Sequence, residues 1–248
     1  APEGTRITES ADGGLELRPP NAGDQSPWLI YIHGGGFLAG SPWTHLGLAS
    51  HLGDAARMRV YLPRYGLAPE RPFPKGRDDL VAAYKAHVDR HGPPGALCGD
   101  SAGGNLALLV AQHARDAGWP LPRAMGLLSP VADLSGDIDG RMAGAQDEML
   151  FPASRLPWIR DTYLQGHDAT DPGASPLLGD LKGLPRTLIQ ASAVEAARPD
   201  AEALGDRMEA ATVELWDRLP HVWHIFAGRA PVADAALLRL AAFLRSAA

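Results

Sequence analysis

The chain has 248 residues and a formal net charge of −6, with 45% hydrophobic and 21% charged residues. These values are typical of a folded globular protein, and the lack of a basic stripe argues against nucleic acid as a partner. Cys98 is the one cysteine, which excludes an internal disulfide and a multi-cysteine metal site. No stretch reaches the about 20 apolar residues of a membrane span. Since residues 1–10 do not resemble a signal peptide, we expect a cytoplasmic protein, although the missing initiator Met leaves a processed or trimmed N-terminus open.

Runs typical of strands alternate with runs typical of helices along the chain. Strands are expected at 15–19, 27–32, 59–63, 95–99, 124–130, 186–192 and 212–216. Helices are expected at 77–92, 102–118, 199–210 and the C-terminus. In the last of these, Leu237, Leu240 and Leu244 form one apolar stripe that would pack on a sheet. The alternation predicts an α/β fold with a mostly parallel central sheet and helices on both faces.

Residues 135–175 interrupt this alternation between two strands of the sheet. The segment is rich in Asp, Gly, Met and Trp, and we expect a helix around 153–165. Because insertions at this level of an α/β sheet usually cover a site, we interpret 135–175 as a cap-like insertion in a single domain spanning 1–248.

The sequence GDSAG at 99–103 has the G-x-S-x-G pattern, follows an expected strand and opens an expected helix. A nucleophile elbow requires this setting, because Gly99 and Gly103 allow the sharp turn that exposes the Ser101 hydroxyl. A serine here also suits a helix N-cap. The motif therefore indicates catalysis only if an oxyanion hole and a base lie elsewhere in the chain.

Three glycines, Gly34, Gly35 and Gly36, follow a buried strand in the segment YIHGGGFLAG at 31–40. Glycines let the backbone turn its N–H groups towards one point without interference from side chains. We therefore expect these glycines and Ala102 to form an oxyanion hole, in which the N–H groups of Gly35, Gly36 and Ala102 are the donors.

These two motifs resemble those of the hormone-sensitive-lipase-like esterases, the bacterial family IV carboxylesterases. Further segments are similar to that family in the same order: YGLAPERPFPKGRDDLVAAY at 65–84, LLSPVADLSG at 127–136, YLQGHDATDPGASPLLGDLKGLP at 163–185 and WDRLPHVWHIF at 216–226. The resemblance implies the α/β-hydrolase fold. It also implies a serine carboxylesterase whose substrates are small-molecule esters with short to medium acyl chains, hydrolysed through an acyl-enzyme. It implies no cofactor and no metal, and it leaves lactones and amides open as substrates.

The base is expected after the last strand, because the chain order in this fold is serine, acid, histidine. Two histidines, His221 and His224, lie there. The resemblance implies that His221 is the base to Ser101 and that His224 lies in its surroundings. The alternative function is a ligand-binding protein on the same scaffold, like the plant hormone receptors that resemble this family and lack the catalytic histidine. The presence of His221 argues against this alternative.

The acid is the least direct assignment, because Val194 stands where many relatives have Asp. In members with a sequence similar to this one, the next residue, here Glu195, is the acid, and either type of carboxylate can orient the histidine. The rival is Asp200, which follows Pro199 in an expected first helical turn, where an acidic residue also serves the helix dipole. We favour Glu195, and loss of the acid is the third interpretation.

The N-terminal region is shorter than in most members of the family. Relatives usually carry some tens of additional residues that form cap helices, whereas the first strands here begin almost at once. We therefore expect either a reduced cap, built from 135–175 alone, or an N-terminal part that was removed. A reduced cap implies a wider acyl pocket. The oligomeric state stays open, with a homodimer among the alternatives.

Overall fold

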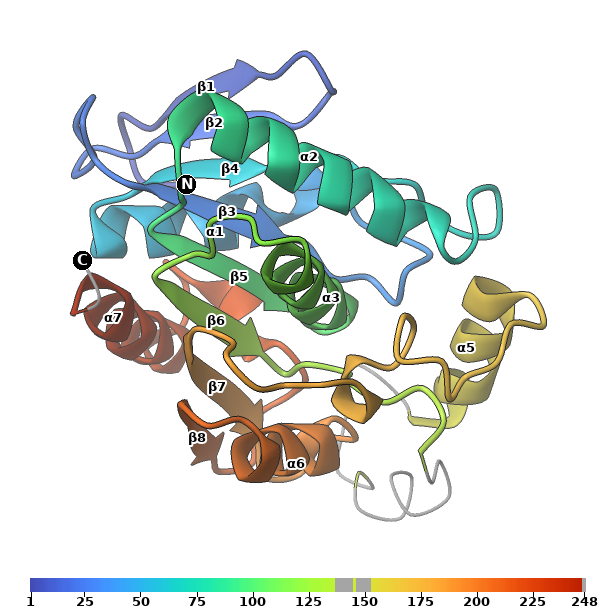
Figure 1. The fold of residues 1–248 in the computed structure, drawn as a ribbon. Coiled ribbons are helices and arrows are strands. Elements are labelled where there is room, and N and C mark those ends of the chain that lie inside the picture. Colours follow the sequence, from blue (N-terminus) through green and yellow to red (C-terminus); the bar gives the residue numbers. More distant parts are fainter. Residues whose placement is uncertain (137–144, 146–152, 247–248) are drawn as a thin grey trace.

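The computed structural model describes residues 1–136, 145 and 153–246. Within them, one eight-stranded sheet has the order β1-β2-β4-β3-β5-β6-β7-β8 (Figure 1). The strands are β1 Arg6–Glu9, β2 Leu15–Arg18, β3 Trp28–Ile32, β4 Arg59–Leu62, β5 Ala96–Asp100, β6 Ala124–Leu128, β7 Arg186–Ser192 and β8 Ala211–Trp216. β2 is antiparallel to both of its neighbours, and every pairing from β4 to β8 is parallel. The predicted α/β fold is confirmed.

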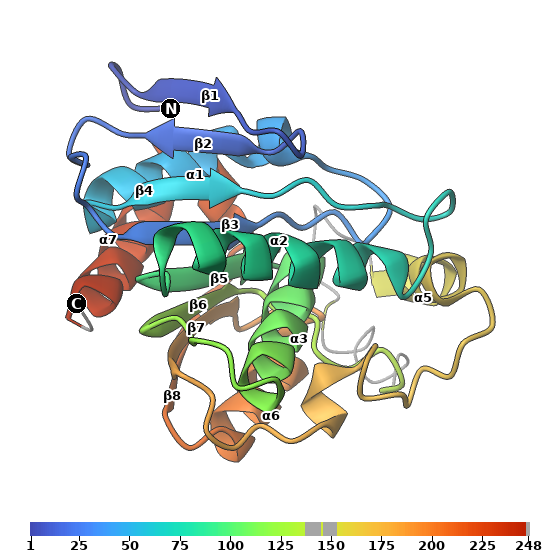
Figure 2. The same cartoon turned by 45° about the horizontal axis from the view of Figure 1, so that its top comes forward.

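Helices cover both faces of this sheet. The α-helices of the described residues are α1 Pro42–Ala56, α2 Lys75–His91, α3 Ala102–Asp116, α5 Leu156–Leu164, α6 Arg198–Arg207 and α7 Pro231–Arg245. In Figures 1 and 2, α2, α3 and α6 lie in front of the sheet and α1 and α7 behind it, whereas α5 lies beyond the ends of the strands. The sheet is therefore the middle layer of three.

The two faces of the sheet carry separate cores, and β3 contributes to both. Ile30 and Ile32 join the core that includes α2 and α3, whereas Leu29 and Tyr31 join the core that includes α1 and α7. Successive side chains of a strand point to opposite faces, so a strand buried on both sides reads as one continuous apolar run.

One strand and one α-helix of the described residues were not expected from the sequence. β1 is exposed along its whole length and carries no apolar alternation. α1 begins with a capping box in which the Ser41 side chain accepts a hydrogen bond from the backbone of Thr44, and Pro42 occupies its first position. These two features favour a helix start. The other described strands and α-helices match the expected ones, with ends that differ by up to three residues, whereas the short 3₁₀ helices Pro176–Leu178 and Trp223–Phe226 were not expected.

Part of the expected insertion 135–175 lies outside the described residues, namely 137–144 and 146–152. In its described part, α5 begins close to the start of the helix expected at 153–165. Tyr163 of α5 stacks on Phe37, with ring centroids 3.9 Å apart, and its carbonyl accepts a hydrogen bond from the Phe73 N–H at 2.9 Å. These contacts fix α5 to the loop after β3 and to the segment between β4 and α2. The division into one domain with a reduced cap stays a prediction.

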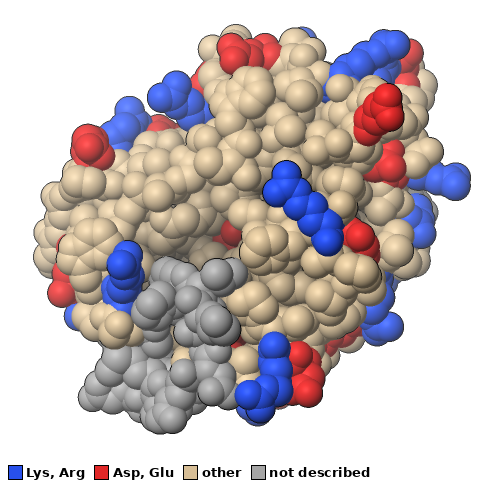
Figure 3. Space-filling view, turned by 180° about the vertical axis from the view of Figure 1, so that it is seen from behind, with Lys and Arg blue, Asp and Glu red and all other residues tan. Residues whose placement is uncertain are grey.

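The surface carries charges of both signs. On the face seen in Figure 3, Lys and Arg are scattered among Asp and Glu, and uncharged side chains make up most of the area. None of the helices in the described ranges has the length and apolar character needed to cross a bilayer. Among the same residues, no group of three or more His, Cys, Asp or Glu side chains is arranged to hold a metal ion.

Packing of α7 on the sheet gives a test of the fold. Leu240 is fully buried, and a Cβ added to Gly126 of β6 would lie 2.8 Å from its Cδ1. We predict that Leu240→Ala lowers the free energy of unfolding by about 2–5 kcal/mol, because it leaves a cavity against the sheet. Urea denaturation followed by circular dichroism measures the change. The control is Leu238→Ala on the exposed side of α7, with an expected effect within about 0.5 kcal/mol. Equal losses in both variants would contradict the packing of α7.

Candidate active site

Ser101 occupies a sharp turn between β5 and α3. Its backbone has φ 51° and ψ −121°, a left-handed conformation that costs a non-glycine residue about 1–3 kcal/mol. A Cβ on Gly103 would lie 2.2 Å from the carbonyl oxygen of Ile32, so α3 approaches β3 as closely as only glycine allows. The Ser101 hydroxyl makes no N-cap hydrogen bond to α3. The turn is therefore the strand–turn–helix arrangement expected of a nucleophile elbow.

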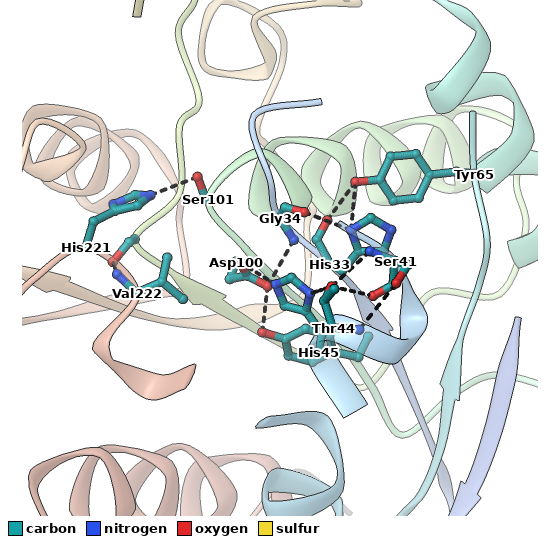
Figure 4. A network of polar contacts seen from close by, with 12 residues as sticks. His33, Gly34, Ser41, Thr44, His45, Tyr65, Asp100, Ser101, His221 and Val222 are labelled. Carbon is teal, nitrogen blue, oxygen red and sulfur yellow. Dashed lines mark hydrogen bonds and ion pairs between the residues drawn. The ribbon is translucent and has the colours of Figure 1, made fainter. Parts of the chain in front are cut away.

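His221 lies beside this serine. It follows β8 on the loop that leads to a short 3₁₀ helix, Trp223–Phe226. Its Nε2 is 2.8 Å from Ser101 Oγ (Figure 4). The backbone next to it is fixed, because the N–H of Val222 donates a hydrogen bond to Ser129 Oγ at 3.2 Å.

Glu195 lies on the other side of the His221 ring. Its Oε2 is 2.5 Å from His221 Nδ1, and its Oε1 accepts a hydrogen bond from the Ser192 N–H at 2.7 Å. The Glu195 residue is 2% exposed. Because an ionised carboxylate only accepts hydrogen bonds, Nδ1 carries the hydrogen and Nε2 presents its lone pair to the serine hydroxyl. The structure brings Ser101, His221 and Glu195 into one hydrogen-bonded chain.

Asp200, the rival acid, points to a different loop. Its Oδ2 accepts hydrogen bonds from the N–H groups of Ala132 and Asp133 at 2.7 and 3.1 Å. It lies in the first turn of α6, and its carboxylate holds the segment that follows β6. Of the two carboxylates, Glu195 is therefore the one that contacts His221.

The expected oxyanion-hole residues meet at the end of β3 and the start of α3. Gly35 has φ 121°, and a Cβ there would lie 2.1 Å from the Ala39 carbonyl oxygen, so this turn requires glycine. Within the described part of the chain, no residue accepts a hydrogen bond from the N–H of Gly35, Gly36 or Ala102. The N–H of Gly34 differs, because it donates to Asp100 Oδ1 at 3.1 Å. Gly34 thus belongs to the loop but its N–H is not available to a ligand.

A buried polar network lies under the oxyanion loop, and sequence reasoning missed it (Figure 4). Asp100 Oδ1 accepts a hydrogen bond from the Tyr31 hydroxyl at 2.8 Å, and its Oδ2 lies 3.4 Å from His45 Nε2. His33 stacks on Tyr65, and burial lowers the pKa of His33 to about 4. Two features of the sequence could have indicated this network: Asp100 lies inside the GDSAG motif, and His33 lies directly before the three glycines.

A family model described as the α/β-hydrolase fold matches residues 29–228. The chain belongs to this family. An acetyl-hydrolase of Streptomyces hygroscopicus is 41% identical over 225 residues, which cover 88% of this chain and 75% of the relative. The crystal structure of an esterase/lipase from an uncultured bacterium has a TM-score of 0.92 and 33% identity, and the match covers 100% of this chain and 86% of that one.

A second solved structure bears on the subfamily of this α/β-hydrolase. An esterase from the bacterial hormone-sensitive lipase family has a TM-score of 0.89 and 38% identity, with 98% of this chain and 84% of that one covered. The resemblance to hormone-sensitive-lipase-like esterases is confirmed.

His224, the second histidine after β8, lies in the interior of this α/β-hydrolase. Its Nε2 is 3.1 Å from Gln190 Oε1, and its ring packs on Trp223 with centroids 3.9 Å apart. Burial lowers the pKa of His224 to about 3, so it is neutral at pH 7. Of the two histidines, His221 contacts Ser101 and His224 packs behind the loop that carries it.

Proposed function

We propose that Ser101, His221 and Glu195 are the catalytic triad of a serine carboxylesterase. The observation that carries the proposal is the 2.8 Å contact between Ser101 Oγ and His221 Nε2, with Glu195 on the opposite ring nitrogen. Relatives of the chain include a carboxylic ester hydrolase and a carboxylesterase of Mycobacterium tuberculosis. The chain is a carboxylic ester hydrolase.

Acylation begins with proton transfer from Ser101 to His221. As Oγ attacks the ester carbonyl carbon, Nε2 takes the hydroxyl proton, and the Glu195 carboxylate stabilises the imidazolium that forms. The tetrahedral intermediate then collapses, the bond to the alcohol oxygen breaks, and His221 gives its proton to the leaving alcohol. The product of this half-reaction is an ester between Ser101 and the acyl group.

The oxyanion hole stabilises the charge that develops on the carbonyl oxygen. The N–H groups of Gly35, Gly36 and Ala102 are the donors in this proposal, and each donor of this kind contributes about 3–4 kcal/mol to the transition state. Deacylation repeats the sequence with water, which His221 deprotonates as it attacks the acyl-enzyme. The acid leaves, and the proton returns to Ser101.

An apolar cavity lies beside the serine, and we assign it to the acyl group of the ester. The side chains that line the cavity next to Ser101 include Phe37, Val131, Leu134, Leu156 and Ile159. Ile159 of α5 also lies against Gly36, where an added Cβ would be 3.4 Å from its side chain. We infer that short acyl groups are preferred, because α5 lies close above the glycine loop. The names of two similar proteins support this inference: the Streptomyces relative is named an acetyl-hydrolase, and a 33% identical protein of known structure was soaked with p-nitrophenyl butyrate, an ester of a short acyl group.

Ser101→Ala tests the nucleophile. The wild-type protein is expected to hydrolyse p-nitrophenyl acetate and to be labelled covalently by a fluorophosphonate. Ser101→Ala is expected to lose the label and to lower kcat by about 10⁵- to 10⁶-fold, because the reacting oxygen is removed. The matched control is Ser50→Ala, which removes another buried serine, in α1, and should keep both properties. A wild-type protein that neither reacts with the phosphonate nor turns over esters would contradict the proposed function.

Glu195→Gln and Asp200→Asn, compared side by side, test the acid. Glu195→Gln is expected to lower kcat for p-nitrophenyl acetate by about 10³- to 10⁴-fold, because the uncharged amide neither selects the required tautomer nor stabilises the imidazolium. Asp200→Asn keeps an oxygen that accepts from the Ala132 N–H, so kcat is expected to change little. The reverse order of the two effects would show that the acid assignment is wrong.

A further inference from the structure

A buried ion pair lies directly behind the nucleophile and takes no part in the triad. Asp100 is the last residue of β5, immediately before Ser101, and is 2% exposed. His45 belongs to α1, which covers the face of the sheet opposite to α3, and it is 6% exposed. Its Nε2 lies 3.4 Å from Asp100 Oδ2. In Figure 4, Gly34 lies directly above Asp100 and His45, and the contact of Ser101 with His221 lies to the left of Gly34.

The hydrogen-bond pattern around His45 assigns a hydrogen to both of its ring nitrogens. Nε2 faces the Asp100 carboxylate, which only accepts. Nδ1 lies 2.8 Å from Thr44 Oγ1, whose own hydrogen is donated to the Ser41 carbonyl oxygen at 2.8 Å. Because one hydroxyl hydrogen cannot serve two acceptors, Nδ1 donates to Thr44. His45 is therefore an imidazolium. Burial opposes this charge, but the charge and hydrogen bond of Asp100 outweigh burial and raise the pKa of His45.

Two other titratable groups next to the pair, His33 and Tyr31, are neutral at pH 7. The His33 ring lies 5.4 Å from that of His45, and burial lowers the pKa of His33 to about 4. Burial also raises the pKa of Tyr31 well above its usual value, so its hydroxyl keeps the hydrogen that it donates to Asp100. For Asp100 itself, burial favours the neutral acid, but His45 and the Tyr31 hydroxyl outweigh burial and lower its pKa. The result is one carboxylate balanced by one imidazolium.

The carboxylate in turn anchors the oxyanion loop. Asp100 Oδ1 accepts the hydrogen bond of the Gly34 N–H at 3.1 Å, and Gly35 and Gly36 follow directly. His33 Nδ1 donates to the Gly34 carbonyl oxygen at 2.8 Å, so both backbone polar groups of Gly34 are held from below. The chain thus places a buried negative charge one residue from the nucleophile and on the first residue of the glycine loop. Without a counter-ion, such a charge would oppose the oxyanion and be costly to bury.

We propose that His45 is a positioning residue for the reaction: as the counter-ion of Asp100, it keeps the carboxylate on the Gly34 N–H and cancels its charge next to the oxyanion. The inference rests on the proposed function. His45 touches neither substrate nor nucleophile, so its effect reaches the reaction through Asp100 and the loop. Loss of the charge at His45 therefore weakens stabilisation of the transition state more than binding of the neutral ester.

The test compares His45→Gln with the double variant Asp100→Asn/His45→Gln. His45→Gln leaves Asp100 without a counter-ion and is expected to lower kcat for p-nitrophenyl acetate by about 10- to 100-fold, a loss up to that of one oxyanion-hole donor, with KM nearly unchanged. The double variant removes both charges and keeps an amide oxygen for the Gly34 N–H. Its kcat is expected to exceed that of His45→Gln by about tenfold. His87→Gln is the control, because it removes another buried histidine, on α2, outside this network.

Three results would overturn the inference: a kcat of His45→Gln within about threefold of wild type, a loss confined to KM, or a double variant no more active than the single one. Circular dichroism checks that each variant folds. If His45→Gln does not fold, the double variant is the test. A folded double variant with kcat within about tenfold of wild type supports charge compensation, and a greater loss of kcat contradicts it. An inactive wild-type protein would instead contradict the proposed function, which keeps the two failures distinct.

Discussion

The left-handed turn at Ser101 is the constraint on which the rest of the site depends. A serine with φ 51° is strained, and the strain persists because β5 before it and α3 after it are both buried in the middle of the molecule. The Ser101 N–H is also held, by the Leu128 carbonyl oxygen of β6 at 2.8 Å. The turn presents Oγ at the carboxyl ends of the parallel strands, where the loops that follow the neighbouring strands also meet.

Parallel pairing brings together residues that lie far apart in the sequence. Ser101 and His221 are 120 positions apart, and the sheet places the ends of β5 and β8 close enough for the loops to meet. Local contacts then orient the histidine: Ser129 fixes the backbone after it, and Glu195 fixes the ring. On the opposite side, the Gly34 N–H binds Asp100, which links the oxyanion loop to the residue before the nucleophile. One strand end, that of β5, thus carries both the nucleophile and the anchor of its oxyanion loop.

The alternation of strand and helix runs was sufficient to predict the fold class. The motifs indicated Ser101, and the family resemblance selected His221 from the two histidines after the last strand; the structure brings these two residues together. The choice between Glu195 and Asp200 could not be made from spacing alone, since both are acidic residues within eight residues of the end of β7. The two carboxylates differ in side-chain orientation: Glu195 contacts His221, whereas Asp200 accepts a hydrogen bond from the backbone after β6. The Asp100–His45 pair could not be predicted from the sequence for a different reason. It joins a strand end to a helix that the sequence did not reveal, because the glycines in α1 at 47 and 53 weaken its helical pattern.

The central claim is that Ser101 reacts in front of three backbone donors, Gly35, Gly36 and Ala102. A crystal structure of the protein inactivated by a small alkyl fluorophosphonate tests it most directly, because the phosphonyl oxygen takes the place of the oxyanion. The account predicts phosphorus bonded to Ser101 Oγ, with that oxygen about 2.7–3.1 Å from the three N–H groups and the Gly34 N–H still on Asp100. Phosphorus on another side chain, or an oxygen turned away from Gly35 and Gly36, would contradict it.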